Sequence, residues 1–169
     1  MIQDDHVCLR PWKEDDVPIL ADIRNDVELQ QQLLSRARGS SRSQVMNWLK
    51  TKSAAKDGFF FVIAHADNDR AAGFLQLSKH DPTDKHIELG LCLHTAEQGK
   101  GMGSQAISLV VEFLRTSVDV RKIILAVRSD NARGIRCYQR LGFDKCGTYR
   151  QHFFCADKWH DVVMMEKFL

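Results

Sequence analysis

The stretch Gln98-Gly99-Lys100-Gly101-Met102-Gly103-Ser104 stands between an apolar strand pattern at 87–93 and an amphipathic helix pattern at 106–115. Its three glycines at alternate positions let the chain turn sharply and leave the amides unshielded by side chains. Because a helix follows at once, free N–H groups and the positive end of its dipole face the loop. The stretch predicts an anion site, with phosphate as the usual ligand. The alternative is a turn that only reverses the chain.

Counting residues excludes the two common nucleotide-binding loops. A Walker loop needs G-x-x-x-x-G-K followed by Ser or Thr, and the chain has no such run. The dinucleotide pattern G-x-G-x-x-G needs a third glycine where the chain has Ser104, counted from Gly99, or Ala106, counted from Gly101. A phosphate-bearing ligand of another kind is therefore expected.

Two motifs resemble the GNAT family of N-acetyltransferases. The glycine-rich stretch matches the pattern Q/R-x-x-G-x-G/A, and residues 131–143 are similar to N-x-x-A-x-x-x-Y-x-x-x-G-F. The second block departs from its pattern at Gly134, where alanine is usual, at some cost in helix propensity. The resemblance implies an enzyme that uses acetyl-coenzyme A as acyl donor. It also implies that the coenzyme pyrophosphate lies on the loop residues, namely Gln98, Gly99, Lys100, Gly101, Met102, Gly103 and Ser104.

Hydrophobic periodicity predicts one domain over residues 1–169, with a mixed α/β (α+β) fold. The resemblance implies a single mixed, mostly antiparallel sheet of about seven strands flanked by about four helices. The segment 33–41 is expected to be an exposed loop. The pattern places strands at 7–12, 59–64, 72–78, 87–93, 122–127, 143–150 and 162–168, and helices at 15–26, 43–56, 106–115 and 131–141.

Composition excludes several classes of protein. The 24 Lys+Arg against 22 Asp+Glu give a net charge of +2, which is no footprint for binding nucleic acid. The 5 cysteines have no paired spacing, and the spacing of His80, His86 and His94 fits no recognised ligand set, so we expect no metal. The acidic start and the lack of a long apolar run favour a cytoplasmic protein without a membrane partner.

Tyr138 and Glu88 are the candidate catalytic residues. The resemblance implies that Tyr138 protonates the departing thiolate of coenzyme A, and that Asn131, on the same helical face, binds the pantetheine or phosphate region. Glu88 interrupts an apolar strand, where a poorly hydrated site raises the strength of a carboxylate base. The alternatives are a core tyrosine and a surface glutamate paired with a lysine.

The resemblance also implies that the backbone of Leu91, Cys92 and Leu93 pairs with pantetheine as an added strand. The N–H of Leu93 would then polarise the thioester carbonyl. A thiol nucleophile at Cys92 or Cys137 is the alternative chemistry, but both are better interpreted as buried small hydrophobic residues.

The acceptor is expected to be a primary amine, on a protein N-terminus, a small metabolite or a nucleotide-linked sugar. The residues Leu9-Arg10-Pro11-Trp12 and the triplet Arg24-Asn25-Asp26 resemble the branch of ribosomal-protein, polyamine and amino-sugar acetyltransferases. The basic segment from Arg36 to Arg42 disfavours a polyamine, unless it is only a solvated loop. Other hypotheses are transfer of another short acyl group, acylation of a hydroxyl, and a non-catalytic acyl-coenzyme A sensor. The chain is expected to be a monomer or a homodimer.

Overall fold

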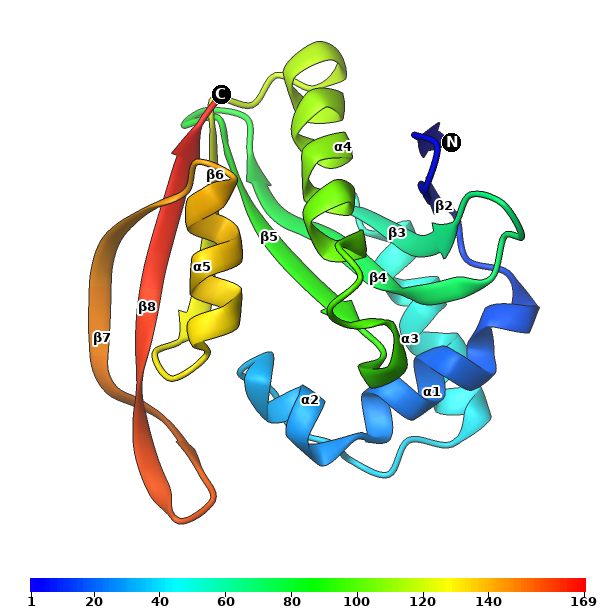
Figure 1. Ribbon diagram of the computed structural model, residues 1–169, viewed down its shortest axis with the longest axis horizontal. Coiled ribbons are helices and arrows are strands. Elements are labelled where there is room, and N and C mark those ends of the chain that lie inside the picture. Colours follow the sequence, from blue (N-terminus) through cyan, green and yellow to red (C-terminus); the bar gives the residue numbers. More distant parts are fainter.

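A computed structural model describes residues 1–169 (Figure 1). One eight-stranded sheet with the order β1-β2-β3-β4-β5-β6-β8-β7 carries five α-helices. None of the helices is long and apolar enough to cross a lipid bilayer. The strands are β1 (Ile2–Gln3), β2 (Val7–Arg10), β3 (Phe59–His65), β4 (Ala71–Asp81), β5 (His86–Leu93), β6 (Lys122–Arg128), β7 (Asp144–Cys155) and β8 (Lys158–Phe168). The helices are α1 (Val17–Asn25), α2 (Val27–Gln32), α3 (Arg42–Ala54), α4 (Met102–Ser117) and α5 (Ala132–Arg140).

The sheet divides at β5 and β6, its one parallel pair. Strands β1 to β5 pair antiparallel, as do β6, β8 and β7. The parallel pairing covers only three steps and ends at Glu88 and Ile124. Beyond Glu88, β5 continues along β4 as far as Leu93 but has no partner on its other side. In Figure 1 the two strands begin side by side near the C-terminus and then move apart, with α5 in front of β6.

Two apolar layers cover the two faces of the larger half-sheet. Alternate strand residues such as Leu75 and Leu89 pack with α4 in the main core. Residues between them, such as Phe74 and Cys92, pack with α1 and α3 in a second core. The period-2 alternation of β4 and β5 therefore separates an α4 side of the sheet from an α1–α3 side.

The predicted element order is confirmed, with two additions. The two-residue β1 makes the sheet one strand longer than expected, and the short α2 begins where the Asp26 side chain accepts a hydrogen bond from the Leu29 amide at 2.9 Å. The helix predicted from residue 106 begins at Met102, inside the glycine-rich stretch. The closing strands extend to a two-residue turn at Ala156 and Asp157, both with positive φ, as expected of a tight hairpin.

Arg10 joins three parts of the fold at the N-terminal end of α1. Its buried guanidinium donates to Asp16 at 2.8 and 3.0 Å, and to Asp69 in the β3–β4 turn. Hydrogen bonds with Asp16 raise the pKa of Arg10 above its ordinary value. Because both Arg10 and Asp16 are buried, removing Asp16 would leave the Arg10 charge with only the more exposed Asp69 as a partner.

We expect Asp16→Ala to lower the free energy of unfolding by about 3–5 kcal/mol, the typical cost of breaking a buried ion pair. Asp15→Ala removes the neighbouring exposed carboxylate and should change it by about 0.5 kcal/mol or less. Urea unfolding followed by circular dichroism measures both variants. Equal losses would show that Arg10 does not depend on Asp16.

Candidate active site

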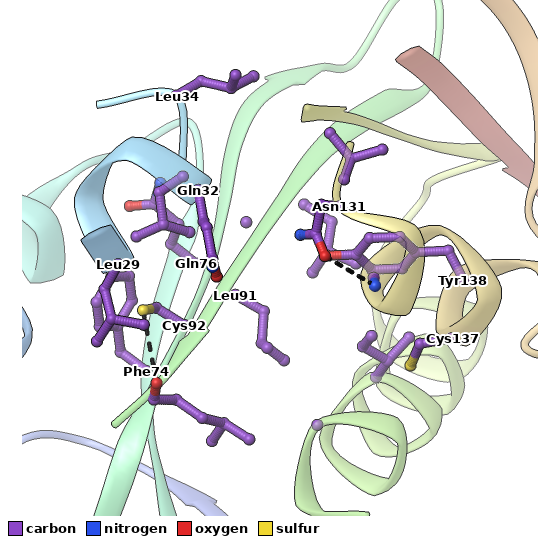
Figure 2. A pocket seen from close by; sticks show the side chains of 18 of the residues that line it. Leu29, Gln32, Leu34, Phe74, Gln76, Leu91, Cys92, Asn131, Cys137 and Tyr138 are labelled. Atoms are coloured by element: carbon purple, nitrogen blue, oxygen red, sulfur yellow. Dashed lines mark hydrogen bonds between the residues drawn. The ribbon is translucent and has the colours of Figure 1, made fainter. Parts of the chain in front are cut away.

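A cavity of about 770 Å³ lies where the sheet divides. Figure 2 shows its two banks: Leu29, Gln32 and Leu34 on one side, and Asn131, Cys137 and Tyr138 on the other. Leu91 and Cys92 of β5 lie between the banks. The cavity therefore connects the α4–α5 side of the sheet with the α1–α3 side.

The glycine-rich loop opens into this cavity with bare backbone. Gly99 and Gly101 have φ of +79° and +82°, a left-handed conformation that favours glycine. Gly101 is the N-cap of α4, and no side chain caps the helix there. The first amides of α4 therefore lack intrahelical partners and are available to an anion. A Cβ on Gly101 would meet nothing within 4 Å, so the space in front of the helix is open.

Lys100 does not line the cavity but anchors its loop. The buried carboxylate of Glu97 accepts from Arg70 at 2.5 Å, and pairs with Lys100 and His65 at 3.1 Å each. Burial alone would raise the pKa of Glu97, but hydrogen bonds from Arg70, Lys100 and His65 lower it to about 2. The ion pairs of Glu97 with Arg70 and His65 thus join the glycine-rich loop to the β3–β4 hairpin.

Three other predicted loop residues have different positions. Ser104 lines the cavity, and its hydroxyl lies 3.2 Å from the Cys137 sulfur. The side-chain amide of Gln98 donates a hydrogen bond to the Leu93 carbonyl at 3.2 Å. This bond joins the loop to the end of β5. Met102 is buried in the main core, so only its backbone is available to a ligand.

Arg133 and Arg140 of α5 also line the cavity, and the sequence analysis missed them. A terminal nitrogen of Arg133 lies 3.2 Å from the place of a Cβ on Gly99, so the guanidinium stands over the loop. One pattern in the sequence could have indicated them: Arg133, Arg136 and Arg140 recur at helical spacing on the polar face of the predicted helix.

Tyr138 and Asn131 meet on the α5 bank as predicted. Burial, with smaller contributions from the Cys137 and Cys92 thiols, raises the pKa of Tyr138 to about 12. The phenol therefore keeps its proton at neutral pH. Asn131 caps α5, since its side-chain oxygen accepts from the Gly134 amide at 3.0 Å.

This cap explains the glycine at position 134. A Cβ there would lie 2.8 Å from the side-chain nitrogen of Asn131 and 3.0 Å from its amide carbon. Such contacts are shorter than van der Waals separation, so alanine would require Asn131 to move. Gly134 therefore lets Asn131 approach the helix closely, which offsets the lower helix propensity of glycine.

The end of β5 has the free backbone edge that was expected. His94 N donates to Ala72 O at 2.9 Å, next to the Gly73–Leu93 pair. By the alternation of an antiparallel ladder, the N–H of Leu93 turns away from β4 toward the cavity. A Cβ on Gly73 would lie 2.1 Å from Cys92 O, so only glycine permits this close approach.

Neither cysteine beside the site has the character of an activated nucleophile. Burial, together with the negative charge of Asp26, raises the pKa of Cys92 to about 12. The Cys137 sulfur lies 3.2 Å from the Ser104 hydroxyl. It forms no hydrogen bond with a lysine, an arginine or a histidine. Cys92 fits the interpretation as a buried small hydrophobic residue, whereas Cys137 is half-buried and lines the cavity.

Glu88 lines the cavity on the α1–α3 side, and Lys79 binds its carboxylate at 2.6 Å. Glu88 is therefore paired with a lysine, as the second interpretation expected, and it also lines the cavity. Its side chain is 32% exposed, which leaves it open to the cavity.

The three residues of the triplet Arg24-Asn25-Asp26 have different roles. Arg24 lines the cavity, Asn25 exchanges hydrogen bonds of 2.7 and 2.9 Å with the backbone of Ser40, and Asp26 caps α2. The segment 33–41 is a loop without helix or strand, as expected, and Ser40 joins its end to α1. Arg36 joins this loop to the closing hairpin, where it donates to Phe154 O at 2.8 Å.

The acetyltransferase (GNAT) domain family matches residues 6–144. A ribosomal-protein-serine acetyltransferase of Escherichia coli K12 is 27% identical over 101 residues, which is 60% of this chain and 56% of that protein. A spermidine N(1)-acetyltransferase of the same strain is 24% identical over 103 residues, 61% of this chain and 55% of that protein. The chain thus aligns with little more than half the length of these relatives.

Solved structures share the fold over nearly the whole chain. A spermidine N-acetyltransferase of Vibrio cholerae, in complex with CoA and spermine, superposes with a TM-score of 0.89 at 19% identity, covering 98% of this chain and 96% of that one. A ribosomal L7/L12 alpha-N-protein acetyltransferase in complex with coenzyme A has a TM-score of 0.87 at 21% identity, with the same coverage. The fold, the two motifs and the family match agree: the chain belongs to the GNAT family of acetyltransferases.

Proposed function

We propose that the protein transfers an acetyl group from acetyl-coenzyme A to a primary amine, by direct attack while both substrates are bound. One observation carries the proposal: the uncapped N-terminus of α4 lies beside Leu91 and Leu93, in the part of β5 that has no partner on one side. An anion-binding end and an unpaired strand edge in one cavity suit a ligand with phosphates at one end and an amide-bearing arm.

The residues present fit such a ligand. The amides of residues 99–104 would hold the pyrophosphate, and the guanidinium groups of Arg133 and Arg140 would balance the remaining phosphate charge. The free edge of β5 at Leu91 and Leu93 would pair with the amides of pantetheine. When bound, the coenzyme supplies an activated acetyl group as a thioester.

At the reacting end, the chain would supply two hydrogen-bond donors, one for the carbonyl oxygen and one for the leaving sulfur. The Leu93 N–H would donate to the carbonyl oxygen as negative charge grows there. The amine nitrogen forms a bond to the carbonyl carbon, the carbon–sulfur bond breaks, and Tyr138 gives its proton to the leaving sulfur. Its pKa of about 12 keeps that proton in place until the thiolate forms.

Glu88 would accept the proton that the bound ammonium must lose before it attacks, directly or through one water. The second proton, which the nitrogen loses as the amide forms, would return to the Tyr138 phenolate. An alkylamine has a pKa of ~10, so at neutral pH it reaches the site protonated. Glu88 lies on the side of β5 away from Tyr138, with the α1–α3 wall in front of it. Glu88 would thus act on the amine and Tyr138 on the coenzyme, and the two substrates would meet where β5 and β6 separate.

The direct test follows release of coenzyme A thiol from acetyl-coenzyme A in the presence of primary amines. Amine-dependent release, with acetylated amine found by mass spectrometry, supports the proposal. Tight coenzyme A binding without turnover of any amine would favour a non-catalytic binding domain. Faster release from propionyl-coenzyme A would favour another short acyl group.

Tyr138→Phe is expected to lower kcat by about 10²-fold, because the leaving thiolate loses its proton donor. The affinity for coenzyme A, measured by calorimetry, should stay unchanged. Tyr149→Phe is the matched control, since the other tyrosine of the chain is exposed on β7. An unchanged kcat in Tyr138→Phe across the pH range would contradict the assigned role.

Glu88→Gln is expected to lower kcat/KM for the amine by about 10²-fold at pH 7. The difference should shrink toward pH 10, where the amine loses its proton without a base. Lys79→Met separates the two roles of Glu88, because it removes the ion pair and keeps the carboxylate. If Glu88→Gln and Lys79→Met have equal effects, Glu88 acts only as a partner of Lys79.

A further inference from the structure

Arg24 is a cation that the fold leaves uncompensated. Its Nε atom is buried and has no hydrogen-bond partner. None of the ion pairs in the molecule includes it. By contrast, the buried arginine and carboxylates of the fold, Arg10, Asp16 and Glu97, are all in ion pairs. Arg24 is half-buried, and a guanidinium whose Nε is buried without a partner is costly, so its retention in a cavity points to a ligand.

The position of Arg24 is fixed by packing. Its guanidinium carbon lies 4.3 Å from the centre of the Trp48 ring, on α3. Stacking on this ring holds the plane of the guanidinium while its nitrogen atoms stay free to donate. Burial, and to a smaller extent the charge of Arg38, lowers the pKa of Arg24, so an anion would relieve an unfavourable environment.

The rest of this end of the cavity has the same sign of charge. Lys52, one helical turn after Trp48, also lines it. Glu88 is the only carboxylate among the lining residues, and Lys79 already binds it. A polyamine would have to place its ammonium groups beside Arg24 and Lys52, with no free carboxylate to receive them.

We propose that Arg24 binds an anionic group, a carboxylate or a phosphate, that the amine acceptor carries. This inference rests on the proposed function, since it assigns the second substrate of the same site. A planar guanidinium donates two parallel hydrogen bonds to either oxyanion, so the two sources share one chemistry. Arg24 is then a specificity-determining residue, and the acceptor differs in charge from the spermidine of the relatives.

The test uses pairs of amines that differ in the anionic group. β-Alanine is compared with propylamine, and O-phosphoethanolamine with ethanolamine, with spermidine as the polycation. Thiol release gives kcat/KM for each, and calorimetry on the protein with coenzyme A gives the affinity. We expect the anionic member of at least one pair to bind about tenfold or more tightly than its neutral partner.

Arg24→Gln should abolish that difference and leave coenzyme A affinity unchanged. Arg42→Gln is the matched control, because it removes an exposed positive charge that does not line the cavity. Loss of the preference in Arg24→Gln alone supports the inference, and the responding pair identifies carboxylate or phosphate.

Three results would overturn the inference: no difference within either pair, an unchanged preference in Arg24→Gln, or spermidine bound more tightly than both anionic amines. The proposed function would survive each of them if some amine is acetylated. Conversely, if no amine is acetylated, the binding measurements still decide the role of Arg24 while the proposed function fails.

Discussion

The structure depends on the place where β5 and β6 stop pairing. Three parallel steps, ending at Glu88, hold the two half-sheets together, and the strands then separate. A buried strand edge must find partners for its N–H and C=O groups. The chain supplies one at Leu93, whose carbonyl accepts from Gln98. The remaining edge faces a cavity that both layers of helices help to line. The separation thus creates a binding strand and a passage between the two faces of one sheet.

The charged groups of the protein are of two kinds, those paired within the fold and those left without a partner. Arg10 and Glu97 are buried and are surrounded by opposite charges that hold helix α1 and the glycine-rich loop in place. The amides at the start of α4 and the guanidinium of Arg24 have no such partners. A net charge of +2 hides this difference, because it sums compensated and uncompensated groups alike. The groups left unpaired, at the start of α4 and at Arg24, line one cavity.

Local sequence patterns predicted the parts of this arrangement that depend on near neighbours. Periodicity predicted the element order, the glycines indicated the bare backbone at the start of α4, and the seven-residue spacing indicated that Asn131 and Tyr138 lie on one side of α5. The six-residue α2 was too short to show a period, and its start depends on the Asp26 cap. The places of Arg24 and Arg133 arise from contacts between distant segments, which no local pattern contains. Lys100 was expected to bind the ligand through its charge, whereas it pairs with Glu97, a partner that its glycine-rich motif does not include.

The central claim is that the bare amides of the glycine-rich loop and the free edge of β5 hold coenzyme A. The most direct measurement is a titration of coenzyme A into ¹⁵N-labelled protein, followed by amide NMR spectra. The account predicts the largest shifts at the amides of residues 99–104 and at Leu93, with little change at the β7–β8 turn. Binding that leaves the loop amides unperturbed, or shifts confined to the closing hairpin, would contradict it.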